Sequence, residues 1–182
     1  MQTLLVTGGA GFIGSCYVLK RCAAGDTVIN LDKLTYSGNP DNLFPLRDNP
    51  RHIFVEGDIG NAELVAYLLQ TYRPNAVVNF AAESHVDRSI LDPDAFVRTN
   101  VFGTCSLLRT VKDGWTLLTP FEKAAFRFLH VSTDEVFGAL NPGDPAFTEE
   151  TPYNPNSPYS ASKASSDLLV RAAHETLGQN VV

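Results

Sequence analysis

The fold is decided by a stretch near the N-terminus, TLLVTGGAGFIG, which runs from Thr3 to Gly14. Its first residues are β-branched or apolar, and they predict a buried strand. A helix is predicted to follow, from Phe12 to Ala24, closed by Gly25. The glycines between them fit G-x-G-x-x-G at positions 9, 11 and 14, and G-x-x-G-x-x-G at positions 8, 11 and 14. Between a strand and a helix, such glycines let the backbone approach a pyrophosphate at the helix N-terminus.

An acidic residue supports a dinucleotide site. Asp32 ends the second predicted strand, eighteen residues beyond Gly14, where a carboxylate can accept hydrogen bonds from a ribose diol. The same carboxylate would repel a 2′-phosphate. The sequence therefore predicts NAD rather than NADP as the cofactor. Without this context, the motif would indicate only a glycine-rich turn beside a solvated acid.

Short apolar runs alternate with helical stretches along the chain. Strands are predicted at Thr3 to Thr7, Thr27 to Leu31, Ile53 to Val55, Ala76 to Ala81 and Phe126 to Ser132. Each is predicted to be buried on both faces, because apolar residues continue without period-two alternation. Helices are predicted at Phe12 to Ala24, Ala62 to Tyr72, Asp94 to Lys112 and Pro158 to Leu177. This order predicts an α/β fold, a doubly wound parallel sheet (Rossmann fold) with helices on both faces.

The domain organisation follows from the same pattern. Residues 1–182 are predicted to form one NAD-binding domain that carries the catalytic residues. Asn180, Val181 and Val182 resemble the opening of a sixth strand that is cut short. The Pro-rich segment from Asn141 to Pro158 is predicted to be a long loop, and such loops are usually functional or flexible.

Composition excludes several classes of partner. The net charge of −6 and a pI near 5.1, without a run of Lys or Arg, argue against nucleic acid and against an anionic membrane. Cys16, Cys22 and Cys105 lack the paired spacing of a zinc site, so reduced thiols and no metal are predicted. No leader and no apolar run of membrane-spanning length is present, which favours the cytoplasm.

A second motif, SPYSASK, begins the last predicted helix. Ser157 suits the N-cap and Pro158 the first helical position. Tyr159 and Lys163 are then four residues apart on one helix face. The Lys163 ammonium is predicted to lower the pKa of the Tyr159 phenol, which would make it a base near neutrality. The alternative is an ordinary exposed pair.

A third motif places two acids after a buried strand, in VSTDEVFG. Asp134 and Glu135 follow the hydroxyl residues Ser132 and Thr133. The acids could cap the next element as solvated side chains, or they could form a proton-handling pair. The residues after two other predicted strands indicate function less specifically. Asp58 fits a helix N-terminus as well as an adenine contact. His85 has no partner residue in the sequence and is more typical of a structural hydrogen bond than of a catalyst.

Taken together, these segments resemble the extended short-chain dehydrogenase/reductase family, and within it the 4,6-dehydratases that act on nucleoside-diphosphate hexoses such as dTDP-glucose. The resemblance spans nearly the whole chain and rests on TGGAGFIGS, LDKLTYSGN, GDI, VVNFAAESHVDRSI, TNVFGT, LHVSTDEVFG and SPYSASKASSD. One departure is Phe137, where the family usually has Tyr. The resemblance implies a lyase that uses NAD without net redox change.

The resemblance also implies roles for particular residues. The implied catalytic residues are Thr133, Asp134, Glu135, Tyr159 and Lys163. The implied cofactor-binding residues are Gly8, Gly11, Phe12, Ile13, Gly14, Asp32, Lys33, Leu34, Thr35, Asp58, Ile59, Phe80, Ala81, Ala82, Ser84, Thr99, Tyr159 and Lys163. Ser84 and Thr133 are the implied substrate-binding residues.

The implied mechanism gives the two acids separate tasks. Tyr159 takes the proton of the sugar C4 hydroxyl while Thr133 hydrogen-bonds that oxygen, and C4 hydride moves to NAD. Glu135 removes the C5 proton, and Asp134, kept protonated by burial and mutual repulsion, gives a proton to the departing C6 hydroxyl. Hydride then returns to C6, which leaves a 4-keto-6-deoxy sugar.

Two alternatives stay open. An epimerase or decarboxylase of the same family needs oxidation at C4 but no dehydrating acid, and usually has small residues at positions 134 and 135. A non-catalytic NAD-binding fragment is the other, because family members are longer and place most sugar-nucleotide contacts in a C-terminal domain that this chain lacks.

The family also forms homodimers, through helices that correspond to Asp94 to Lys112 and Pro158 to Leu177. The nucleobase cannot be predicted from this chain.

Overall fold

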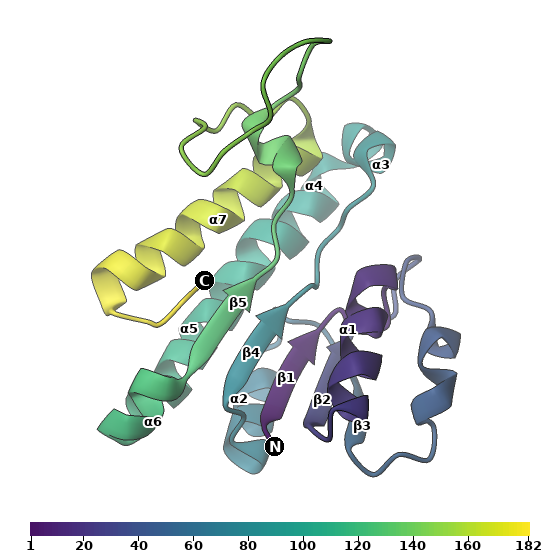
Figure 1. Cartoon of the computed structure of the whole chain (residues 1–182), viewed down its shortest axis with the longest axis vertical. Helices are drawn as coiled ribbons and strands as arrows, with labels where there is room; N and C mark the ends of the chain where they lie inside the picture. Colours follow the sequence, from purple (N-terminus) through teal and green to yellow (C-terminus); the bar gives the residue numbers. More distant parts are fainter.

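A parallel sheet lies at the centre of the structure, a computed structural model that describes residues 1–182 (Figure 1). Its strands are β1 (Thr3–Thr7), β2 (Thr27–Asp32), β3 (His52–Glu56), β4 (Ala76–Asn79) and β5 (Arg127–His130). All four pairings are parallel, and the strand order is β3-β2-β1-β4-β5. The predicted fold class, a doubly wound parallel sheet with helices on both faces, is confirmed.

Helices cover both faces of this sheet. The longer ones are α1 (Phe12–Ala23), α2 (Ala62–Tyr72), α5 (Thr104–Thr116) and α7 (Pro158–Leu177). The shorter ones are η1 (Pro40–Leu46), α3 (Val86–Leu91), α4 (Pro93–Phe96), η2 (Val97–Gly103), α6 (Pro120–Ala125) and η3 (Asp134–Phe137). None of them combines the length and apolarity needed to cross a lipid bilayer.

Two hydrophobic cores hold the layers together. Because successive strand residues point to opposite faces, Leu5 and Ile29 pack under α2, α5 and α7, whereas Leu4 and Val28 pack under α1 and η1. Burial on both faces is thus confirmed for the central strands. The prediction of burial on both faces is wrong for β3. This strand pairs with β2 alone, and its Phe54 is 39% exposed.

The path of the chain creates a crevice. From β1 the chain runs outward through β2 and β3, and then returns to place β4 on the other side of β1. Val6 accordingly pairs with Asn30 on one side and with Val78 on the other. In such sheets, ligands bind outside the carboxyl ends of the strands at the point where the order reverses. Here that point lies between β1 and β4.

Several element boundaries differ from the predicted ones. β4 ends at Asn79 and β5 at His130, each two residues early, because the residues that follow leave the sheet to line the crevice. The single helix predicted from Asp94 to Lys112 is divided into α4, a π-helical turn (η2) and α5. The unpredicted α6 begins with a capping box between Thr119 and Glu122, a signal that the sequence does contain.

The outer edge of β5 is partly paired by the last residues of the chain. Val181 forms an isolated parallel bridge with Phe128. The Val182 N–H donates to the Phe128 carbonyl at 2.8 Å, and the His130 N–H donates to the Val182 carbonyl at 2.9 Å. The predicted opening of a sixth strand is therefore present as a short stretch of parallel pairing.

The fold predicts a specific sensitivity at Gly8. Its φ is +70°, and a Cβ there would lie 2.6 Å from the Ala81 backbone nitrogen. Gly178, the C-cap of α7, has a similar φ of +65° but no neighbour within 4 Å of its virtual Cβ. We expect Gly178→Ala to lower the free energy of unfolding by about 1 kcal/mol, and Gly8→Ala by about 2 to 5 kcal/mol. Urea denaturation measures both, and equal losses would contradict the close approach of β1 and β4.

Candidate cofactor and active site

A cavity of about 400 Å³ opens at the carboxyl ends of the strands, where the strand order reverses. Every residue of the predicted cofactor set except Leu34 lines it. The cavity wall also contains residues that the sequence analysis did not select: Leu31, Ser37, Gly38, Gly57, Glu83, Val131 and Ser132. The sequence could have identified most of these residues, because they adjoin predicted site residues just after β2, β3, β4 and β5.

The glycine turn between β1 and α1 forms one end of this cavity. The Gly8 N–H donates to the Leu31 carbonyl at 2.9 Å, which ties the turn to β2. A Cβ at Gly14 would lie 2.2 Å from the Gly8 carbonyl oxygen, so only glycine fits there. Gly11 is the N-cap of α1 and supplies no capping side chain. The first N–H groups of α1 are therefore free to bind an anion, which fits a pyrophosphate.

Asp32 lies at the end of β2 and is only 8% exposed. Its Oδ2 accepts the Ala10 N–H at 2.8 Å, and its Oδ1 accepts the Leu34 N–H at 2.9 Å. The predicted ribose acceptor thus also fixes the glycine turn and the loop after β2. Because each carboxylate oxygen has a second lone pair, and Asp32 lines the cavity, it can still accept a bond from a diol.

Lys33 and Asp58 form an ion pair at the β2 and β3 side of the cavity, with Nζ and Oδ2 2.7 Å apart. Burial of Asp58 opposes its ionisation, but hydrogen bonds from Lys33 and from the Gly60 N–H outweigh it and hold the Asp58 pKa below its usual value. Asp58 is not the N-cap of α2, because Asn61 fills that position. Of the two interpretations left open by the sequence, the structure favours a place in the cavity wall.

Behind the opposite wall, Asn100 joins three segments of the chain. It belongs to the π-helical turn η2 and is 1% exposed. Its side chain accepts the Glu83 N–H at 2.8 Å and donates to the Glu83 carbonyl at 2.9 Å. It also donates to Ser162 on α7 at 2.8 Å. Sequence analysis missed Asn100, and the π turn that positions it has no simple sequence signature, although such turns are frequent at functional sites.

The start of α7 brings Tyr159 and Lys163 into the cavity. Ser157 and Ser160 form a capping box around Pro158, as the sequence predicts for the helix start. Tyr159 is 9% exposed and Lys163 is 3% exposed, and both line the cavity. The alternative of an ordinary exposed pair is therefore wrong.

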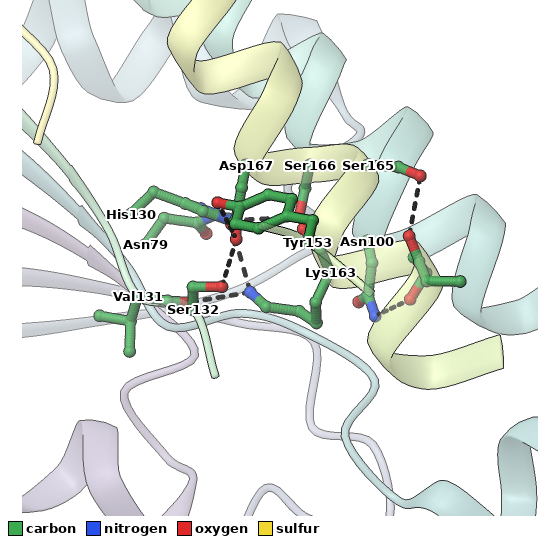
Figure 2. A network of polar contacts seen from close by, with 12 residues as sticks. Asn79, Asn100, His130, Val131, Ser132, Tyr153, Lys163, Ser165, Ser166 and Asp167 are labelled. Atoms are coloured by element: carbon green, nitrogen blue, oxygen red, sulfur yellow. Dashed lines mark hydrogen bonds and ion pairs between the residues drawn. The ribbon is translucent and has the colours of Figure 1, made fainter. Parts of the chain in front are cut away.

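The predicted lowering of the Tyr159 pKa is also wrong for this chain. Burial raises the pKa of the phenol, and the carboxylates of Glu135 and Asp134 raise it further, against a hydrogen bond with Thr133 that lowers it. Lys163 does not compensate, because its Nζ donates to the Val131 carbonyl at 2.7 Å (Figure 2). Burial lowers the Lys163 pKa to about 8.

Thr133, Asp134 and Glu135 lie at the rim beside Tyr159 rather than in the cavity wall. Thr133 is the N-cap of η3 and accepts the Glu135 N–H at 3.3 Å. Asp134 is exposed and Glu135 is half-buried, so the burial expected for both acids is found only in part. Both carboxylates raise the pKa of the Tyr159 phenol. The acids therefore start the next element and also act electrostatically on the candidate base.

The departure at Phe137 has a packing explanation. Its ring lies 5.4 Å from that of Phe147 and 5.5 Å from that of Tyr153, centroid to centroid. Phe147 and Tyr153 both belong to the long loop predicted between β5 and α7. Phe137 thus anchors this loop by aromatic contacts, which need no hydroxyl group.

Lys163 yields a prediction for stability against pH. Its folded pKa of about 8 lies below 10.5, the usual pKa of a lysine, so the folded chain binds fewer protons than the unfolded chain between these pH values. Stability must therefore rise with pH in that window. Relative to Lys163→Met, the wild type should gain on the order of 3 kcal/mol of unfolding free energy between pH 8 and 10.5. Denaturant titrations of both proteins at several pH values measure this difference, and parallel curves would contradict it.

Comparisons with known proteins agree with this geometry. A family model described as GDP-mannose 4,6 dehydratase matches residues 5–182. The dTDP-glucose 4,6-dehydratase of Xanthomonas campestris pv. campestris strain B100 is 60% identical over 182 residues, which are 100% of this chain and 52% of that protein. The dTDP-glucose 4,6-dehydratase of Haemophilus influenzae is 49% identical, over 100% of this chain and 54% of that protein. The chain spans about half the length of the curated relatives it matches.

Solved structures give the same result. A crystal structure of dTDP-glucose 4,6-dehydratase from Streptomyces venezuelae with NAD bound matches with a TM-score of 0.87 and 49% identity, over 98% of this chain and 53% of that one. UDP-glucose 4-epimerase from Brucella ovis in complex with NAD matches with a TM-score of 0.84 and 26% identity, over 100% of this chain and 50% of that one. By its sequence match from residue 5 to residue 182, the chain belongs to the GDP-mannose 4,6 dehydratase family.

Proposed function

We propose that this chain is the NAD-binding and catalytic part of a dTDP-glucose 4,6-dehydratase. One observation carries the proposal: a single cavity joins the glycine turn and Asp32 at one end to Tyr159 and Lys163 at the other. The carboxylates of Asp134 and Glu135 raise the pKa of the Tyr159 phenol. The identity of 49 to 60% with curated dehydratases supports this substrate class over others.

The fit to a dinucleotide rests on groups already in place. The free N–H groups at the start of α1 would hold the pyrophosphate, and Asp32 would accept from the adenosine ribose. The Lys163 ammonium has one protein acceptor, the Val131 carbonyl, and its remaining N–H groups can bind hydroxyls of the second ribose. When bound, NAD supplies a hydride acceptor and a positively charged ring at this end of the cavity.

Tyr159 is the residue that handles the C4 hydroxyl proton. Its pKa is raised in the isolated chain, so it needs nearby positive charge to act as a base. Lys163 does not lower the Tyr159 pKa, because its ammonium donates to the Val131 carbonyl, so the positively charged ring of bound NAD would have to supply this charge. Thr133, which hydrogen-bonds Tyr159, can bond the same substrate oxygen. Oxidation at C4 makes the neighbouring C5 proton acidic.

Glu135 and Asp134 then serve the elimination. Glu135 takes the C5 proton, and Asp134 gives a proton to the C6 hydroxyl as it leaves. Because Asp134 is exposed in this chain, the burial that keeps it protonated has to come from the bound sugar and from the rest of the whole protein. Two adjacent carboxylates suit adjacent carbons, and this arrangement favours a dehydratase over an epimerase, which needs no acid at C6.

The remaining parts of the proposal concern the whole protein. We place most sugar-nucleotide contacts, including those that select the nucleobase, in the half of the relatives that this chain does not cover. Exposed Phe102 on η2 and Leu168 on α7 supply apolar surface for a homodimer through η2, α5 and α7. Three unpaired cysteines agree with a reducing cytoplasm.

Cofactor choice is testable on the chain itself. We expect NAD to bind about tenfold more tightly than NADP or better, because the Asp32 carboxylate repels a 2′-phosphate. Isothermal titration calorimetry gives both affinities. Asp94→Asn, a change at an exposed site on α4, serves as the control and should bind NAD as the wild type does. Tighter binding of NADP would refute the role of Asp32.

The role of Glu135 is testable in a full-length protein that contains this chain. Glu135→Gln should slow exchange of the C5 hydrogen with solvent by about 100-fold or more, since the base for that proton is lost. Proton NMR of dTDP-glucose in deuterated buffer follows the exchange. Glu149→Gln, the same change at an exposed loop position, should leave it unaltered. Retained exchange in Glu135→Gln would refute this role, and NAD binding without any turnover by the wild type would favour a binding module.

A further inference from the structure

A continuous chain of buried hydrogen bonds leads from the cavity wall to the catalytic helix. It begins at the Ala81 N–H, which donates to the Thr7 hydroxyl at 3.3 Å. The Thr7 hydroxyl and the Asn79 Oδ1 lie 2.5 Å apart. The Asn79 Nδ2 in turn lies 3.0 Å from the His130 Nδ1. Thr7 and Asn79 are at most 1% exposed, so no water competes for these bonds.

The donors along this chain fix the protonation of His130. The Thr7 hydroxyl accepts the Ala81 N–H, and its own O–H donates to the Asn79 Oδ1. The Asn79 amide nitrogen, which can only donate, therefore faces His130. The His130 Nδ1 must accept this bond, and the proton of the neutral ring must lie on Nε2. Burial lowers the His130 pKa, which agrees with a neutral ring.

Three groups of α7 surround the His130 Nε2 (Figure 2). Ser166 Oγ lies 3.2 Å away and accepts, because its own O–H donates to the Lys163 carbonyl at 2.8 Å. Asp167 Oδ1 lies 3.4 Å away and has no hydrogen-bond partner. Lys163 Nζ also lies 3.4 Å away. Since Nε2 carries a proton, Lys163 cannot donate to it, and the ammonium is directed to the Val131 carbonyl and the cavity.

Asp167 is held as a fixed anion behind this ring. Its Oδ2 accepts the Ser132 hydroxyl at 2.5 Å and the Tyr153 hydroxyl at 3.2 Å. Its side chain is 10% exposed, and that of His130 is 3% exposed. The carboxylate thus connects the end of β5, the long loop and α7 (Figure 2). With His130 neutral, the 3.4 Å contact between its Nε2 and the Asp167 Oδ1 is not an ion pair.

We propose that His130 and Asp167 are positioning residues for Lys163: Asp167 is its counter-charge, and His130 is a neutral spacer that directs the ammonium into the cavity. A proton relay through His130 is excluded by the same contacts, because Nδ1 faces a donor and Nε2 already carries a proton. The positions of His130, Asp167 and Lys163 do not depend on the proposed function. The consequence of this arrangement for catalysis does rest on the proposed function.

Other charged groups around the pair come from several elements. On α7, Tyr159 precedes Lys163 by one turn and Arg171 follows Asp167 by one turn. The charge of Arg171 lowers the pKa of the Tyr153 phenol. From η3, the carboxylates of Asp134 and Glu135 raise the pKa of Tyr159. Asp167 is the charged group that acts on Lys163 itself, and it raises the lysine pKa against the effect of burial.

The tautomer is tested by long-range proton–nitrogen NMR of the 182-residue chain, which has four histidines. His130→Gln assigns the signal. We expect the His130 Nδ1 to show the shift of an unprotonated nitrogen and Nε2 that of a protonated one from pH 6 to 8. A proton on Nδ1 would overturn the positioning role, because the Asn79 amide and Lys163 would then be oriented differently.

The counter-charge is tested by NMR titration of lysines labelled at Cε, of which the chain has five. Lys163→Met assigns the signal of Lys163. Asp167→Asn keeps the shape and removes the charge, so the Lys163 pKa should fall by roughly one unit from about 8. Asp94→Asn should leave it unchanged. A folded Asp167→Asn chain with unchanged Lys163 titration would refute the proposal, with folding checked by circular dichroism.

A kinetic arm separates this inference from the proposed function. In the full-length protein, Asp167→Asn should move the limb of the kcat/KM pH profile that reports Lys163 to lower pH, by the same shift that NMR gives. Asp94→Asn should leave the profile in place. An absence of turnover in the wild type would count against the dehydratase function alone, since both NMR results stand without it. An unmoved profile in an active Asp167→Asn enzyme would overturn the role of the pair in catalysis.

Discussion

The close approach of two backbone segments, the glycine turn after β1 and the segment after β4, is the constraint on which the site depends. Both segments leave the sheet where its strand order reverses, and Gly8 lies against the backbone of Ala81. A side chain at Gly8 would separate them. Because this contact is kept, Thr7 and Ala81 share a hydrogen bond, and the polar chain through the sheet starts at the cavity wall.

The second half of the site depends on how a cation is kept inside a protein. Lys163 is almost completely buried, and burial opposes its charge. The Val131 carbonyl, which accepts from the ammonium, and the Asp167 carboxylate, which lies behind the neutral His130 ring, offset this effect. Tyr159, a helical turn away, has a raised pKa instead. Positive charge near the phenol would therefore lower its raised pKa, while the Lys163 amine lines the same cavity.

Local patterns in the sequence, namely apolar runs, glycine spacing and helix caps, predicted the sheet and the glycine turn, and the family resemblance implied most of the cavity wall. Neither predicted Asn100, His130 or Asp167. Each acts through partners far away in the sequence, as when Asn100 joins Glu83 and Ser162. The pKa of Tyr159 was mispredicted for the same reason, since the spacing on a helix face cannot tell that the lysine turns to the Val131 carbonyl.

The π-helical turn η2 has a further consequence for how this site can change. A π turn holds one residue more than an α-helical turn, so it rotates whatever precedes it relative to α5 by about 100°. Deletion of a single residue within 101–103, between Asn100 and α5, would rotate Asn100 and the residues before it by about 100° relative to α5. Thr99 and Asn100 would then turn away from the cavity and from α7. The geometry of one wall therefore depends on a single inserted residue, which evolution can add or remove in one step.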